Sequence, residues 1–137
     1  MREDGLQISI VTTLERTFPG LYFHHSPNGW FAGGNPGQAA RQAAKLKAMG
    51  TRNGFPDLYF ELPKMVEHGG ELAFTGEYEP AYIELKLPGG TLTDAQKLFR
   101  DRCLERKIKW ALCRSYEEVR NKLIEWLQTC IESVNSI

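Results

Sequence analysis

Residues 81–87 form an apolar run, AYIELKL, that carries two charges, Glu84 and Lys86. A short apolar run of this kind is typical of a buried strand. Because side chains on a strand alternate between its faces, Glu84 and Lys86 share one face with Tyr82, and the apolar residues between them take the other. Burying a carboxylate and an ammonium costs on the order of several kcal/mol unless they are paired or bind an ion. The run therefore indicates either a solvated edge strand or a site that compensates both charges.

A second carboxylate, Asp57, opens another predicted strand at residues 57–62, directly after Pro56. Proline fixes the backbone at the entrance of a strand. If the two strands are neighbours, Asp57 and Glu84 converge, and their oxygens are the hard ligands that Mg²⁺ or Mn²⁺ prefers. A nearby lysine such as Lys86 can orient an attacking water or help to deprotonate it. The pattern predicts phosphodiester hydrolysis at a metal site.

These residues resemble the PD-(D/E)xK nuclease superfamily, with Pro56-Asp57 as the first half of its motif and Glu84-Leu85-Lys86 as the second. The motif is short, and by itself it is weak. Further segments are similar to one branch, the VRR-NUC domain of stand-alone bacterial and phage type, and they follow its order along nearly the whole chain. These segments are EDGLQ at 3–7, HHSPNG at 24–29, KLKAMG at 45–50, GFPDL at 54–58, PGGTLTDAQ at 88–96 and RSYEE at 114–118.

The resemblance implies a metal-dependent nuclease with a restriction-endonuclease-like core, Mg²⁺ as its ion and Mn²⁺ as a substitute. Asp4 is an alternative to the N-terminal acid Glu3, because both lie about one helical turn before Gln7. The TRNG sequence at 51–54 departs from the family's small-residue approach to the motif, which bears on how that loop meets DNA. The implied site comprises Asp57, Glu84 and the backbone carbonyl of Leu85 as metal ligands, Lys86 as catalytic lysine, Gln96 as active-site helix residue, and Glu3 as acid of the first helix.

Length and composition favour one globular domain. A chain of 137 residues with 42% hydrophobic content supports one core, so we expect a single domain over residues 1–137. No apolar run is long enough to span a bilayer, and the charged start does not resemble a secretory signal, so we expect a cytoplasmic protein. The cysteines Cys103, Cys113 and Cys130 lack C-x-x-C spacing, which favours a packing role over a disulfide framework or zinc site.

The formal net charge is zero, so bulk electrostatics do not predict a protein that coats nucleic acid. Acidic residues gather between residues 61 and 84, where they could attract cations, and basic residues flank them. The basic residues at 97–109 could equally be the solvated face of a helix. The candidate DNA contacts are Asn28, Lys45, Lys47, Arg52, Lys97 and Arg100.

The order of predicted elements indicates an α/β fold, a three-layer-like sandwich with a mixed central sheet flanked by helices. Thr93 and Gln96 fit a helix capping box, a structural role for Gln96 that could coexist with one in the active site. His24 and His25 are adjacent on a strand, so at most one can face the carboxylates. The predicted elements are helices at 4–17 and 38–49, with Gly50 as C-cap, strands at 21–25, 57–62, 81–87 and 108–113, a glycine-rich loop at 28–37, a helix after Thr93, and a last helix opened by a capping box at Ser115.

The leading functional hypothesis is an endonuclease acting on branched DNA such as a Holliday junction, as a homodimer whose symmetry places two sites on one substrate. The alternatives are a catalytically idle DNA-binding or assembly subunit, and a nuclease for flaps or RNA. Retention of Asp57, Glu84 and Lys86 speaks against the idle subunit. Candidate dimer surfaces are the first helix, through Ile8, Ile10, Val11 and Leu14, and the aromatic strand, through Tyr22 and Phe23, with core packing as the alternative for both.

Overall fold

The computed structural model describes residues 3–25, 36–50 and 52–128. Within them the chain forms a four-stranded sheet in the order β1-β2-β3-β4. The pairs β1/β2 and β2/β3 are antiparallel and β3/β4 is parallel, so the sheet is mixed, as predicted. The strands are β1 (Tyr22–His25), β2 (Leu58–His68), β3 (Glu71–Leu85) and β4 (Lys109–Cys113).

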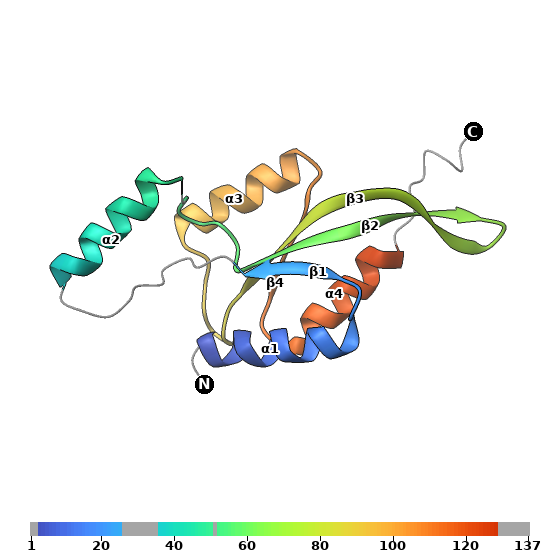
Figure 1. Ribbon diagram of the computed structural model, residues 1–137, viewed down its shortest axis with the longest axis horizontal. Helices are drawn as coiled ribbons and strands as arrows, with labels where there is room; N and C mark the ends of the chain where they lie inside the picture. Colours follow the sequence, from blue (N-terminus) through green and yellow to red (C-terminus); the bar gives the residue numbers. More distant parts are fainter. Residues whose placement is uncertain (1–2, 26–35, 51, 129–137) are drawn as a thin grey trace.

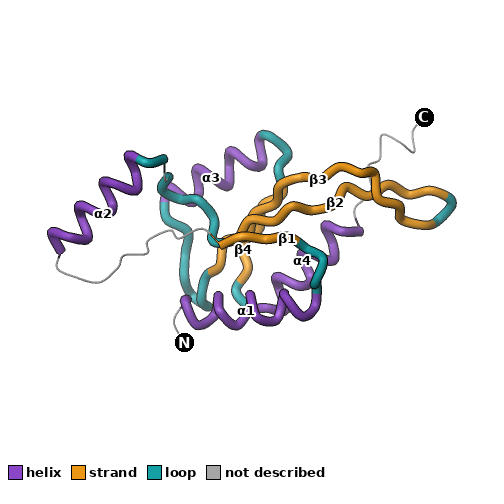
Figure 2. Tube along the Cα trace, in the orientation of Figure 1, coloured by secondary structure: helices purple, strands orange, loops and turns teal. Residues whose placement is uncertain are grey.

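Helices cover both faces of this sheet. The helices α1 and α4 lie below it in Figure 1 and α3 lies above it, which gives three layers. The helix α2 projects beyond the end of the sheet, as the tube in Figure 2 also shows. The predicted α/β sandwich is therefore confirmed. The helices are α1 (Glu3–Thr17), α2 (Pro36–Ala48), α3 (Asp94–Glu105) and α4 (Tyr116–Gln128), with bounds close to those predicted.

The main core lies between the sheet and the layer formed by α1 and α4. Leu6, Ile10 and Leu14 recur every four residues on α1, so they share one face, and all three are buried. From α4, Val119 and Leu123 lie four residues apart on one face and enter the same core. This packing fixes the sheet against α1 and α4 and leaves its other face to α3 and the charged residues.

The hairpin of β2 and β3 is much longer than predicted. The strands turn at Gly69 and Gly70, both with positive φ, which suits a two-residue hairpin loop. The register shifts between Pro63 and Met65, where Lys64 lies opposite three residues of β3, including Gly76 at φ 90°. A bulge of this kind keeps two strands paired where the regular pattern is broken.

The charged strand lies inside the sheet. β3 has β2 on one side and β4 on the other, so the hypothesis of a solvated edge strand is wrong. Glu84 is 3% exposed and Lys86 is 9% exposed, while Ile83 on the opposite face is fully buried in the core. Both charges are therefore buried, and the fold must compensate them.

Candidate active site

Asp57 lies at the entrance of β2, immediately after the fully buried Pro56. Leu58 of β2 pairs with Ile83 of the antiparallel strand β3, so Asp57 lies beside Glu84. Its Oδ2 accepts a hydrogen bond from the backbone N–H of Leu85 at 2.8 Å. This bond fixes the Asp57 carboxylate against the strand that carries Glu84, which is the convergence that the sequence predicted.

Gln96 connects α3 to Glu84 through both ends of its side-chain amide. Its Nε2 donates to Oε1 of Glu84 at 2.9 Å, and its Oε1 accepts from the backbone N–H of Thr93 at 2.8 Å. The Thr93 hydroxyl in turn accepts from the backbone N–H of Gln96, which completes the predicted capping box. The capping role is thus confirmed, and the same geometry brings Gln96 into contact with Glu84. The other oxygen of Glu84, Oε2, is also buried.

Lys86 lies just past the end of β3, where its backbone N–H donates to the carbonyl oxygen of Cys113 at 3.1 Å. The loop that follows turns tightly, since the N–H of Gly90 donates to the carbonyl oxygen of Leu87 at 2.9 Å. A Cβ on Gly90 would lie 3.6 Å from Cβ and Cδ of Lys86. The loop thus packs on the aliphatic stem of Lys86 and restricts its path.

Arg114 holds this loop in place, a role that the sequence did not reveal. Its Nη1 donates to the carbonyl oxygens of Leu87 and Gly90, both at 2.8 Å. The backbone N–H of Arg114 donates to the carboxylate of Glu118 on α4, while the Ser115 hydroxyl accepts from the N–H of Glu118. The only signal in the sequence was an arginine directly after a buried strand. Its role can be recognised only when β4 is known to lie beside β3.

Other predicted site residues are less closely tied to these carboxylates. Glu3 is the first residue of α1, whose N-terminal end lies at the same end of the molecule as the loop after β3 (Figure 1), but its side chain is outside the described part. Asp4 is exposed, and Asn28 lies outside the described residues. His25 Nδ1 is 3.2 Å from the carbonyl oxygen of Asp57, so it contacts the backbone at the site.

Two carboxylates, a backbone carbonyl and water or phosphate oxygens make an all-oxygen donor set suited to Mg²⁺. Asp57, Glu84 and the carbonyl of Leu85 fit this requirement chemically, and Leu85 itself is anchored in the core. Among the described residues no group of three His, Cys, Asp or Glu side chains comes together as a metal site. Glu3, whose side chain lies outside the described part, stays the predicted third carboxylate, with Asp4 as the alternative.

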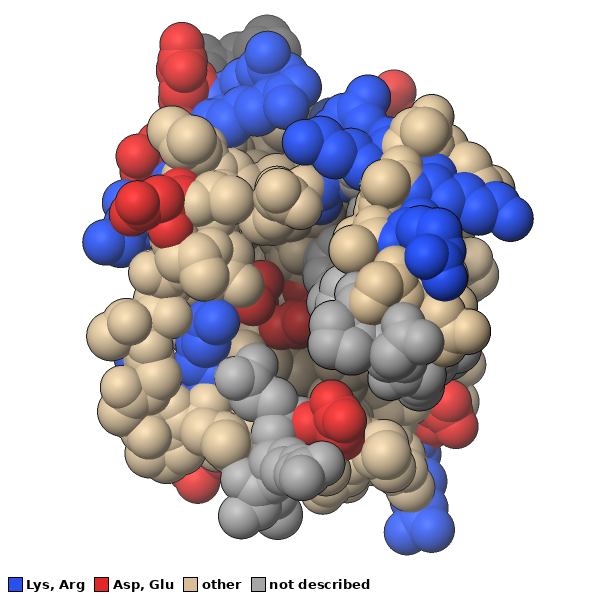
Figure 3. Space-filling model, turned by 90° about the vertical axis from the view of Figure 1, so that its left-hand side faces the viewer, with Lys and Arg blue, Asp and Glu red and all other residues tan. Residues whose placement is uncertain are grey.

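Charge is distributed unevenly at this end of the molecule. Figure 3 shows Asp and Glu residues at the floor of a hollow, with Lys and Arg residues along its upper rim. Of the predicted DNA contacts, Lys45, Lys47, Arg52 and Lys97 are exposed, whereas Arg100 is half-buried and forms an ion pair with Asp101 at 3.0 Å. Lys109, in the same basic stretch, is also paired, with Glu79.

The acidic residues between 61 and 84 do not form a cation-binding cluster. They are spread along the hairpin, and Glu67 and Glu71 flank its tip. Glu67 lies nine residues from Leu58 along β2, or about 30 Å at the rise of a strand. The prediction of a cluster was wrong because it assumed that residues close in sequence stay close to Glu84, while an extended hairpin carries them away.

A family model of the VRR-NUC domain matches residues 3–117. The chain belongs to the VRR-NUC family. A solved structure described as a VRR_NUC domain protein has the same fold, with a TM-score of 0.66 at 21% identity, and the match covers 95% of this chain and 91% of that one. A comparison with curated proteins gives no match.

The VRR-NUC match takes in every element of the site, from the start of α1 to the start of α4. It includes Asp57, Glu84, Lys86 and Gln96 as well as the unpredicted Arg114. Membership of this nuclease family agrees with a chemistry built on two carboxylates and a lysine. None of the described helices is long and apolar enough to cross a membrane.

Proposed function

We propose that this VRR-NUC protein is an endonuclease that hydrolyses DNA phosphodiester bonds with Mg²⁺, for which Mn²⁺ can substitute. The observation that supports it most is the convergence of Asp57, Glu84 and Lys86 at one end of the β2 and β3 pair. The hydrogen bond from the Leu85 N–H to Asp57 joins the two halves of the motif. Family membership supports the same class of reaction.

The ion would be held by the carboxylates of Asp57 and Glu84 and the backbone carbonyl of Leu85. Bound there, it would polarise the scissile phosphate and lower the pKa of a water. The loop after β3 packs on the aliphatic stem of Lys86 and limits the conformations of its side chain. The ammonium would thereby be held near the phosphate or the attacking oxygen. Gln96 keeps the carboxylate of Glu84 in one orientation.

The test is cleavage of labelled DNA in Mg²⁺, Mn²⁺ or EDTA by the wild-type protein and by Asp57→Asn and Glu84→Gln. Each substitution removes the charge of one proposed ligand with almost no change in volume, so each should abolish cleavage. DNA binding in EDTA, measured by fluorescence anisotropy, should survive. Cleavage near the wild-type rate in Mg²⁺ by either variant would show that the metal site is wrongly assigned.

We also propose that the substrate is branched DNA, with the Holliday junction as the leading case, and that the protein acts on it as a homodimer. A small domain with zero net charge is a weak electrostatic clamp, and a dimer doubles its basic surface. A panel of four-way junction, flap, splayed and linear DNAs tests the substrate. Preferential cleavage of flaps or of RNA would favour the alternative nucleases, and binding without cleavage in any metal would favour an idle subunit.

The structure narrows the candidate dimer surfaces. Ile10 and Leu14 are fully buried in the core, so they are unavailable to a partner and that part of the prediction was wrong. Val11 and Phe23 pack against the same core. Ile8 on α1 is 67% exposed and Tyr22 on β1 is 60% exposed, so these two remain. Sedimentation at micromolar concentration tests the oligomer, and a monomer that makes paired nicks in four-way junctions would rule the dimer out.

A further inference from the structure

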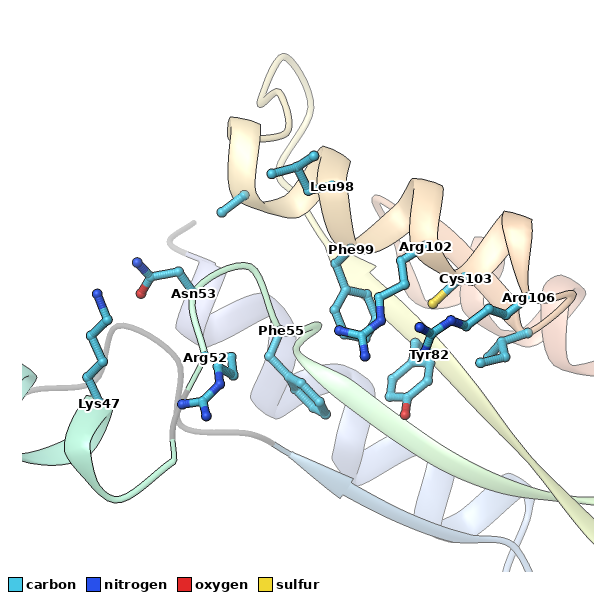
Figure 4. Close-up of a pocket in the computed structure, with 12 residues that line it drawn as sticks. Lys47, Arg52, Asn53, Phe55, Tyr82, Leu98, Phe99, Arg102, Cys103 and Arg106 are labelled. Carbon is cyan, nitrogen blue, oxygen red and sulfur yellow. The ribbon is translucent and has the colours of Figure 1, made fainter.

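A pocket of about 620 Å³ lies beside the candidate active site, between the loop before β2 and α3 (Figure 4). Tyr82, which lines it, lies two residues along β3 from Glu84 on the same face, a separation of about 7 Å. Ala95, which precedes Gln96, also lines it. Asp57 and Glu84 are not among its lining residues, so the pocket adjoins the site and is separate from it.

The lining of this pocket is strongly basic. It contains Lys47, Arg52, Arg102 and Arg106 and no acidic residue, in a chain whose formal net charge is zero. Arg102 lies in the last turn of α3 and Arg106, one turn further on, is its C-cap, and Figure 4 shows both side chains extending toward Tyr82. Among the described residues no carboxylate forms an ion pair with either arginine. Like charges one turn apart on a helix destabilise it, and a bound anion would relieve their repulsion.

The same pocket contains three aromatic rings. Phe55 meets Tyr82 and Phe99 edge-on at centroid distances of 5.6 and 5.3 Å, and Tyr82 meets Phe99 at 5.1 Å. Burial, with a smaller contribution from Tyr59, raises the pKa of Tyr82, so its hydroxyl stays neutral at physiological pH. The rings therefore add apolar surface and leave the basic character of the pocket unchanged.

Arginines beside aromatic rings match the two parts of a nucleotide. A guanidinium binds phosphate oxygens, and a ring stacks on the face of a base. Bases within a duplex have both faces covered by their neighbours, so a paired nucleotide cannot present its base to such a pocket. The volume of about 620 Å³ lies within the usual range for small-ligand pockets.

We propose that this pocket binds an unpaired nucleotide of the DNA substrate next to the scissile phosphate. The inference rests on the proposed nuclease function, and among branched substrates it favours a flap or splayed duplex, which carries a single-stranded segment beside a duplex, over a fully paired four-way junction. Arg102 and Arg106 contact its phosphates, and the rings of Phe55 and Phe99 stack on its base. A fully paired four-way junction makes no use of the pocket unless a nucleotide unpairs at its crossover.

Binding of fluorescent DNA in EDTA tests this without any dependence on cleavage. Arg102→Gln/Arg106→Gln should weaken binding to a splayed duplex by about tenfold or more, and binding to a fully paired duplex of the same length by about twofold. The matched control is Arg16→Gln/Arg120→Gln, which removes the same charge from exposed positions on α1 and α4, the helices of the other layer. The control should weaken binding to both DNAs slightly and equally.

The aromatic half of the pocket is tested by Phe55→Leu and Phe99→Leu, which keep apolar bulk but remove the ring. Each should lower affinity for the splayed duplex about fivefold or more while the slope of log affinity against log salt stays the same. In the arginine variant that slope should fall by about one to two, because phosphate contacts are lost. Circular dichroism and thermal unfolding check that each variant is folded.

The outcomes separate this inference from the proposed function. Equal losses for splayed and paired DNA in the arginine variant would overturn the inference, because the pocket would then contact the backbone without regard to pairing. Unchanged affinity for the splayed duplex in both phenylalanine variants would overturn the stacking. Either result is compatible with metal-dependent cleavage at Asp57 and Glu84, and failure of cleavage in every metal leaves the binding comparison intact.

Discussion

The guanidinium of Arg114 donates through Nη1 to the carbonyl oxygen of Leu87 at 2.8 Å, and the same nitrogen reaches the carbonyl oxygen of Gly90 at 2.8 Å. Leu87 directly follows Lys86, whose own N–H is bonded to the residue before Arg114, Cys113. The arginine thus ties the loop after β3 to the end of β4. It acts on Lys86 through the loop and does not itself reach the carboxylates in any contact described.

Arg114→Gln should lower kcat about ten- to a hundredfold with little change in KM, because a small displacement of Lys86 is costly to reaction geometry. The half-buried carbonyls also lose their donor, so the free energy of unfolding should fall by about 1–3 kcal/mol. Arg114→Lys should restore stability more than it restores kcat, since a rotatable ammonium can donate to both carbonyl oxygens without holding the loop in the fixed geometry of a planar guanidinium. Steady-state kinetics and urea unfolding measure both. A loss of stability with unchanged kcat would show a purely structural role.

Lys86→Met should be inactive and should still bind the metal ion. The ammonium is proposed to act on the charge of phosphate and water, and methionine preserves most of the buried stem that Gly90 packs against. Isothermal calorimetry with Mg²⁺ or Mn²⁺ separates the two effects. If metal binding disappears along with cleavage, the lysine supports the site structurally and its catalytic assignment must be withdrawn.

Gln96→Leu should lower both stability and activity more than Thr93→Ala. Both substitutions break the capping box, which costs about 1 kcal/mol of helix stability. Gln96→Leu in addition removes the donor to Glu84, so its kcat should fall at least about tenfold further. Thermal unfolding and kcat are measured for both. Equal activity in the two variants would mean that Gln96 serves only as a cap.

Gly54→Ala should destabilise the protein much more than Gly50→Ala. Both glycines have positive φ, 80° and 110°, so each substitution carries the left-handed penalty of about 1–2 kcal/mol. A Cβ on Gly54 would lie 2.4 Å from the carbonyl oxygen of Ala95, whereas one on Gly50 would have nothing within 4 Å. The difference in unfolding free energy between the two variants therefore measures how tightly the loop before β2 packs on α3. Equal losses would show that the loop can move away from the helix at little cost.

Cys113 should resist thiol reagents in the folded protein at neutral pH. Burial, with a smaller contribution from Glu118, raises its pKa from 9.0 to about 12, so the reactive thiolate is scarce. Between these values the unfolded chain releases a proton that the folded chain retains, so stability should fall as pH rises through this window. Iodoacetamide labelling mapped by mass spectrometry, with the urea-denatured chain as reference, checks the reactivity. Rapid labelling of native Cys113 at pH 7 would contradict it.

The motif strands were predictable from sequence because their patterns are local. The run around Glu84 alternates, and Pro56 marks the strand entrance at Asp57, so both carboxylates could be assigned before any pairing was known. Pairing then needed one assumption, that the strands are neighbours, and the register of Leu58 with Ile83 confirms it.

The rest of the hairpin and the role of Arg114 depend on contacts that the local pattern does not encode. Pro63, Pro80 and Gly76 look like strand breakers, yet two prolines are tolerated in the hairpin and Gly76 lies in the bulge. Arg114 reaches the loop after β3 because β4 runs parallel to β3. Two parallel strands need a long connection, here α3, so the residues that Arg114 contacts are far from it in the sequence. Its partners therefore could not be found from neighbouring residues.

The bulged hairpin has a consequence for how other molecules can bind it. β1 pairs with β2 only as far as Glu61, so within the described chain the outer edge of β2 from Leu62 onward has no neighbouring strand. Such an edge is a template on which a foreign strand could extend the sheet. Pro63 offers no N–H there, and the distortion at Lys64 breaks the regular spacing of backbone donors and acceptors. This stretch of the β2 edge is thereby a poor template for a foreign strand, which limits edge-to-edge aggregation there.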